Sequence, residues 1–72
     1  MKTEQEIREK AKRLFYRSFM VDDNGNNELA SSMQARADLL LDFVLEYNGY
    51  EKDAVWEEAL DEYSECRRRA AQ

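Results

Sequence analysis

The stretch NELASSMQARADLLLDFVLEYN, residues 27–48, decides the fold because apolar residues cover more than half of its surface when it is helical. At about 100° per residue, one line of apolar side chains runs along the helix and two further pairs widen that line. The line consists of Leu29, Met33, Ala37, Leu40, Val44 and Tyr47; Leu39 and Phe43 widen it on one side, and Leu41 and Leu45 on the other. One neighbouring helix cannot cover so wide a surface. We therefore predict a helix over about 28–48 that lies between two other helices.

The same surplus of apolar surface has an alternative explanation. Leu41 and Leu45 could remain uncovered in the monomer and form the contact surface of a homodimer, with Tyr16 beside them. A chain of 72 residues buries only about 60% of its unfolded surface, so additional burial by self-association would be useful to it.

Two breaks separate this helix from its neighbours. Residues 22–27 combine aspartate, asparagine and glycine, which favour turns, and we expect Asn27 to cap the second helix. The second break is Asn48-Gly49. Gly49 can adopt the left-handed conformation that follows many helices, with Tyr50 folding back onto the last helical turn.

The flanking segments, about 4–20 and about 52–70, have the patterns of amphipathic helices. Thr3 and Glu6 have the spacing of a capping box at the start of the first. The predicted buried stripes are Ile7, Ala11, Leu14, Phe15 and Phe19 in the first helix, and Trp56, Ala59, Leu60, Tyr63, Cys66 and Ala70 in the third. We predict an all-α fold, a small antiparallel three-helix bundle with the second helix central, in a single domain over residues 1–72.

The composition argues against several classes of function. Histidine is absent and Cys66 is the only cysteine, so zinc binding, histidine-based catalysis and an internal disulfide are not expected. The longest apolar runs contain three residues, far fewer than the roughly 20 that span a membrane. We expect a cytoplasmic protein that is not an enzyme, has no cofactor or metal and does not bind membranes.

Charge is segregated along the chain. Residues 1–21 carry six basic and three acidic side chains, whereas residues 22–49 carry one and six, and residues 50–72 carry four and seven. Between Asp38 and Glu65, Lys52 is the only cation among ten acids. Many of these acids are four residues apart, a spacing at which like charges destabilise a helix by a few tenths of a kcal/mol per pair. We predict that they form a partner-binding face consisting of Asp38, Asp42, Glu46, Glu57, Glu58, Asp61, Glu62 and Glu65.

The leading functional hypothesis is a small acidic protein that binds a basic, nucleic-acid-binding surface of a larger protein and so inhibits or regulates it. In size and charge it is similar to phage-encoded inhibitors of host defence, including anti-CRISPR proteins that mimic DNA. Direct nucleic-acid binding is not expected, because the acids would repel phosphates. The alternative is a structural or regulatory subunit that self-associates, as a homodimer for example, through exposed apolar residues of the second helix.

Overall fold

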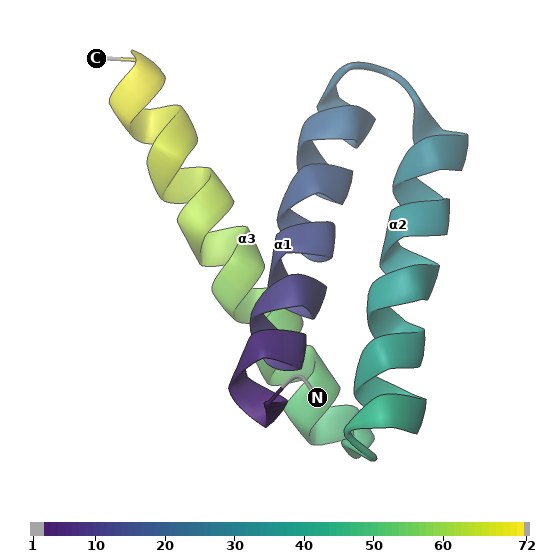
Figure 1. The fold of residues 1–72 in the computed structure, drawn as a ribbon. Helices are drawn as coiled ribbons and strands as arrows, with labels where there is room; N and C mark the ends of the chain where they lie inside the picture. Colours follow the sequence, from purple (N-terminus) through teal and green to yellow (C-terminus); the bar gives the residue numbers. More distant parts are fainter. Residues whose placement is uncertain (1–2, 72) are drawn as a thin grey trace.

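The computed structural model describes residues 3–71 and contains four helical elements (Figure 1). They are α1 (Glu4–Asp23), α2 (Asn27–Leu39), the π-helical turn η1 (Leu40–Val44) and α3 (Gly49–Ala71). The described part contains no strand, so the all-α prediction is confirmed. The predicted single domain over 1–72 also includes Met1, Lys2 and Gln72, which lie outside the described residues.

Side chains cap all three helix starts. The Thr3 hydroxyl accepts a hydrogen bond from the Glu6 amide at 3.2 Å, as the capping box predicts. α2 begins one residue earlier than expected, because Asn26, not Asn27, accepts a hydrogen bond from the Leu29 amide at 3.2 Å. In each case the capping side chain lies three residues before the amide from which it accepts a hydrogen bond.

The start of α3 differs more strongly from the predicted one. Asn48 and Glu51 cap each other: the Glu51 amide donates to Asn48 Oδ1 at 2.9 Å, and the Asn48 amide donates to Glu51 Oε2 at 3.1 Å. α3 therefore starts at Gly49, where a connecting loop was predicted. Tyr50 does not fold back onto the preceding helix but is 86% exposed.

The second helix ends at Val44, earlier than the predicted Tyr47 or Asn48. Its last turn widens into η1, in which the Leu45 amide donates to the Leu40 carbonyl at 3.1 Å, five residues back. The left-handed residue that closes it is Glu46, with φ of 56°, and not Gly49 as predicted. The Tyr47 amide then donates to the Leu41 carbonyl at 2.7 Å and satisfies one of the terminal acceptors.

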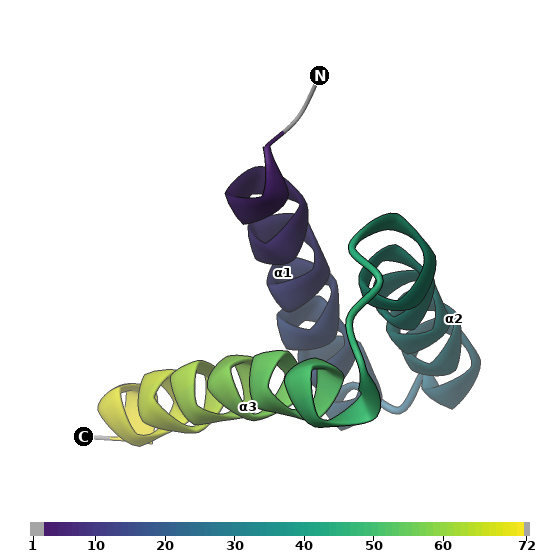
Figure 2. The same cartoon turned by 90° about the horizontal axis from the view of Figure 1, so that it is seen from below.

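α1 is the helix that packs extensively against both others. α2 runs antiparallel along one side of α1, and α3 crosses on the other side and extends away from the pair (Figures 1 and 2). α2 meets α3 mainly near Lys52, whose ammonium lies 3.4 Å from Asp38. The prediction that the second helix contacts both neighbours is thus confirmed in part, but the most extensive contacts with both belong to α1.

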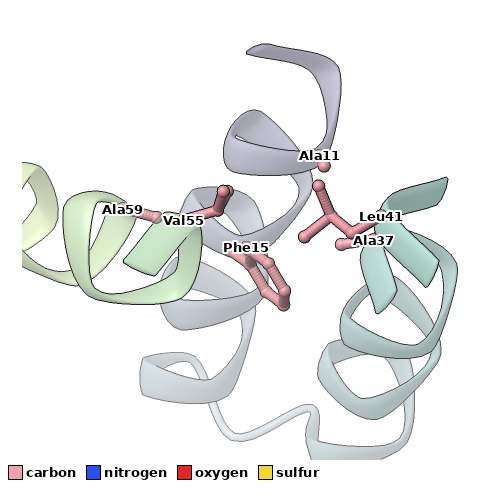
Figure 3. Packing of buried hydrophobic residues seen from close by; sticks show 6 residues of the cluster. All are labelled: Ala11, Phe15, Ala37, Leu41, Val55 and Ala59. Atoms are coloured by element: carbon pink, nitrogen blue, oxygen red, sulfur yellow. The ribbon is translucent and has the colours of Figure 1, made fainter. Parts of the chain in front are cut away.

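The core is small and rich in alanine. Figure 3 shows Ala11 and Phe15 of α1 between the side chains of the two neighbouring helices. Those side chains are Ala37 and Leu41 on one side, and Val55 and Ala59 on the other. Small residues permit the backbones to approach closely, and buried Ser18 of α1 is satisfied because it donates to the Phe15 carbonyl and accepts from Gln34.

The buried face of the second helix is rotated from the predicted one. Ala30, Ala37 and Leu41 are buried, whereas the predicted core residues Leu29 and Val44 are exposed. Leu41 is fully buried, so a dimer surface cannot include it, whereas Leu45 and Tyr16 are half-buried. The apolar side chains that remain uncovered here are Leu39, Phe43 and Val44. Close packing on α1 selects the face with alanines over the face with the greatest hydrophobicity.

The buried face of α3 agrees with the predicted one in part. Val55, Ala59 and Tyr63 are buried, while Trp56, predicted in the core, is 37% exposed. Cys66 and Ala70 are exposed because the C-terminal part of α3 extends beyond the other helices (Figure 2). Ala59 and Tyr63 belong to the predicted stripe and are buried as expected, whereas Val55 is buried in place of Trp56.

Consecutive leucines of the DLLLD segment differ sharply in burial, which gives a test of the helix phase. We expect Leu41→Ala to lower the free energy of unfolding by about 2–5 kcal/mol, because it leaves a cavity against Ala11 and Phe15. The matched control Leu39→Ala should change it by less than about 0.5 kcal/mol, because Leu39 is exposed. Urea unfolding followed by circular dichroism measures both, and equal losses would contradict the assigned phase.

Candidate functional site

The eight carboxylates of the predicted partner-binding face occupy three different environments. Four lie close to cations of another helix, one pairs within α3, and three have no ion pair among residues 3–71. The four close to a cation of another helix are Glu58, Glu62, Asp38 and Asp42. Glu65 is the one that pairs within α3, and the three without an ion pair in that range are Glu46, Glu57 and Asp61. The predicted face is therefore not one uniform acidic surface.

Glu58 and Glu62 lie along the edge of α3 that faces α1. Arg8 forms an ion pair with Glu58, and one turn further along, Lys12 Nζ lies 3.0 Å from Glu62 Oε1. Both helices advance by four residues between the two pairs, so the pairs lie one helical turn apart along the contact between α1 and α3. The hydrogen bond with Glu62 raises the pKa of Lys12 above its ordinary value. These two acids thus hold α3 against α1.

Lys52 lies between two carboxylates of the second helix. Its ammonium is 3.4 Å from Asp38 Oδ1 and 3.7 Å from Asp42 Oδ1, so one cation serves both acids. This contact ties the start of α3 to α2 and η1. At the other end of α3, Glu65 accepts a hydrogen bond from Arg69 at 2.8 Å.

Glu57 and Asp61 lie on the face of α3 opposite Val55 and Ala59. Asp53, one turn earlier, continues their line at the four-residue spacing. All three side chains are exposed, and none forms an ion pair within the part of the chain that the structure describes. We call Asp53, Glu57 and Asp61 the outer ladder. Glu46 is also exposed, but it lies in the loop before α3 and is separate from this helix face.

A groove between α2 and α3 joins the acids of the two helices. Its volume is about 540 Å³, and Phe15 of the core contributes to its lining. The other lining residues are Gln34, Ala35, Asp38, Lys52, Asp53 and Trp56. Trp56 packs edge-on against Phe19, with ring centroids 5.6 Å apart. The sequence reading missed this groove because it placed Trp56 in the core.

A second set of polar contacts joins the C-terminal end of α1 to α3. The Tyr63 hydroxyl donates a hydrogen bond to the Asp23 carboxylate, and Arg67 forms an ion pair with Asp23 at 3.2 Å. The hydrogen bond with Asp23 raises the pKa of Tyr63 above its ordinary value. The Arg67 guanidinium also lies 5.9 Å from the centre of the Tyr63 ring. These contacts position α3 and leave the outer ladder uncovered.

The cations of α1 are divided between two faces. Arg8 and Lys12 face α3, whereas Lys10, Arg13 and Arg17 are exposed. No ion pair involves these three exposed cations within residues 3–71. The molecule therefore presents basic charge on α1 and acidic charge on the outer ladder.

Other kinds of site find no support in the described residues. No group of three or more acidic or cysteine side chains there is arranged to hold a metal ion. None of the helices in the same part of the chain has a segment long and apolar enough to cross a membrane. Comparison of the chain with protein-family models, curated proteins and solved structures gives no match.

Proposed function

We propose that this protein is a small protein-binding module whose acidic surface binds a basic surface of a larger protein. The acidic surface consists of the outer ladder, Asp53, Glu57 and Asp61, together with Asp38 and Asp42 across the groove. When the basic surface of the partner is one that binds nucleic acid, the module competes with that nucleic acid. Such a competitor acts as an inhibitor or regulator, in the manner of phage anti-defence and anti-CRISPR proteins.

The outer ladder is the observation that carries this proposal. Its three carboxylates repeat about every 6 Å along one rigid helix, so they present a linear array of negative charge to a partner. Basic side chains that bind phosphates can bind such an array as well. Electrostatic complementarity of this kind speeds association and selects among partners.

The energetic cost of the ladder supports a role beyond folding. Asp53 and Glu57, Glu57 and Asp61, and Asp61 and Glu65 all set like charges four residues apart, and each pair costs a few tenths of a kcal/mol. Ion pairs with Arg8 and Lys12 offset the repulsion for the acids that face α1. Glu57 and Asp61 have no such ion pair among the described residues. A binding partner with basic residues would supply it.

Binding can be tested with two variants that change the net charge equally. The immobilised protein is incubated with a lysate of its native host, and captured proteins are competed with duplex DNA and with salt. We expect the double variant Glu57→Gln/Asp61→Asn to reduce capture of DNA-competable proteins about tenfold, which corresponds to about 1.4 kcal/mol. The control Glu58→Gln/Glu62→Gln should retain capture, because its two acids already pair with α1.

Circular dichroism must show that both double variants remain helical at the temperature of the assay. Equal losses in the two variants would indicate that net charge alone governs capture. Capture that survives Glu57→Gln/Asp61→Asn, or that does not weaken with added salt, would contradict the proposal.

A second candidate function, a self-associating structural or regulatory subunit, is favoured by one observation. Phe43 is 73% exposed, and Leu39 and Val44 are more than half exposed beside it. Large uncovered apolar side chains that lie together often mark protein contacts. Sedimentation equilibrium at micromolar concentration separates the two candidates: a dimer that Phe43→Ser dissociates would support self-association, and a monomer would exclude it.

A further inference from the structure

We propose that the groove between α2 and α3 binds the side chain of an arginine from the basic partner. This inference rests on the proposed function and names the group that the acidic surface recognises. The groove combines three properties on which recognition of a guanidinium depends: an apolar floor, an exposed aromatic ring and carboxylates at its edges.

Phe15 and Trp56 supply the apolar and aromatic parts of the groove. Phe15 is a core residue that is only 5% exposed, so its position is set by the packing of all three helices. Trp56 is held by its edge-to-face contact with Phe19, at an interplanar angle of 87°. Because the ring is fixed by packing, binding a ligand beside it costs little additional ordering. The aliphatic stem of an arginine can cover Phe15 while its guanidinium lies near Trp56.

The charges around the groove favour a cation. Asp38 lines it from α2 and Asp53 from α3, and Lys52 is the only cation in the lining. Lys52 is shared by Asp38 and Asp42, whereas Asp53 has no ion pair within residues 3–71. The lining therefore holds two carboxylates and one ammonium, a net charge of −1, and Asp42 adds a further negative charge beside Lys52.

The chemistry of the lining selects arginine over lysine. A guanidinium is planar, so it can stack against Trp56 and still donate two parallel hydrogen bonds to a carboxylate such as Asp53. An ammonium is more strongly hydrated and has no flat face to stack. Phosphate groups are repelled by the same carboxylates, so the groove does not suit nucleic acid. The volume of about 540 Å³ is ample for one long side chain.

Trp56 is the only tryptophan of the chain, so its fluorescence reports directly on the groove. We titrate the full-length protein with hexa-arginine and, separately, with hexa-lysine at low ionic strength. Hexa-arginine is expected to change the emission of Trp56 saturably and to bind at least about fivefold more tightly than hexa-lysine. Calorimetry provides the same affinities for variants that lack the tryptophan.

Two groove variants and one control locate the binding site. Trp56→Leu keeps an apolar contact for Phe19 and should bring the affinity for hexa-arginine to within about twofold of that for hexa-lysine. Asp53→Asn should weaken hexa-arginine about tenfold. The control Asp61→Asn removes the same charge one turn beyond Glu57, outside the groove, and should preserve the preference for arginine.

The outcomes separate this inference from the proposed function. Equal affinities for the two peptides, or binding without any response of Trp56, would overturn the arginine site while leaving the acidic surface intact. The same holds if Trp56→Leu and Asp61→Asn, both confirmed as folded, reduce the preference equally. If neither peptide binds at low salt, both the arginine site and the acidic surface are contradicted.

Discussion

The packing of α1 between its two neighbours is the constraint on which the rest of the structure depends. Ala11 and Phe15 contact both α2 and α3, so the position of α1 determines which face of each neighbour is buried. Ala37 of α2 and Leu41 of η1 face inward on one side of α1, and Val55 and Ala59 of α3 face inward on the other. Leu39, Phe43 and Trp56 are exposed as a consequence.

The same packing sorts the acids of α3 into two classes. Arg8 and Lys12 of α1 meet Glu58 and Glu62 along the inner edge of α3. The outer ladder lies beyond their reach, and its charge stays uncompensated among the described residues. The outer ladder thus presents uncompensated negative charge on α3, whereas Lys10, Arg13 and Arg17 present positive charge on α1. For the basic partner that we propose, such a charge distribution would favour one orientation before contact, which net charge alone cannot do.

The groove is a further consequence of this packing. Because α2 and α3 both lie against α1 but meet each other only near Lys52, a space remains between them, with Phe15 in its lining. Asp38 and Asp53 enter that lining from different helices. Recognition of a basic side chain would therefore depend on the tertiary fold and not on any contiguous sequence motif.

Local signals in the sequence predicted the number of helices, their approximate bounds and the cap at Thr3. Hydrophobicity correctly placed Ala11 and Phe15 in the core, but it did not predict the phase of the second helix, because close helix packing favoured alanines over the larger residues Leu29 and Val44. The ion pairs of α1 with α3 join residues 50 positions apart, so the spacing of acids within one helix could not reveal them. No residue type indicates a π-turn or a left-handed glutamate as clearly as glycine indicates a left-handed backbone. The left-handed residue was therefore predicted at Gly49, whereas it is Glu46.

Adjacent residues of α3 allow the sorting of its acids to be measured directly. The free energy of unfolding of Asp61→Asn and Glu62→Gln, each determined by urea titration at low ionic strength, compares an outer with an inner acid. We predict opposite signs: a gain of a few tenths of a kcal/mol for Asp61→Asn, from relief of repulsion by Glu57 and Glu65, and a loss of about 0.5–1 kcal/mol for Glu62→Gln, from loss of the pair with Lys12. Changes of the same sign in both variants would contradict the division of α3 into a neutralised inner edge and an uncompensated outer ladder.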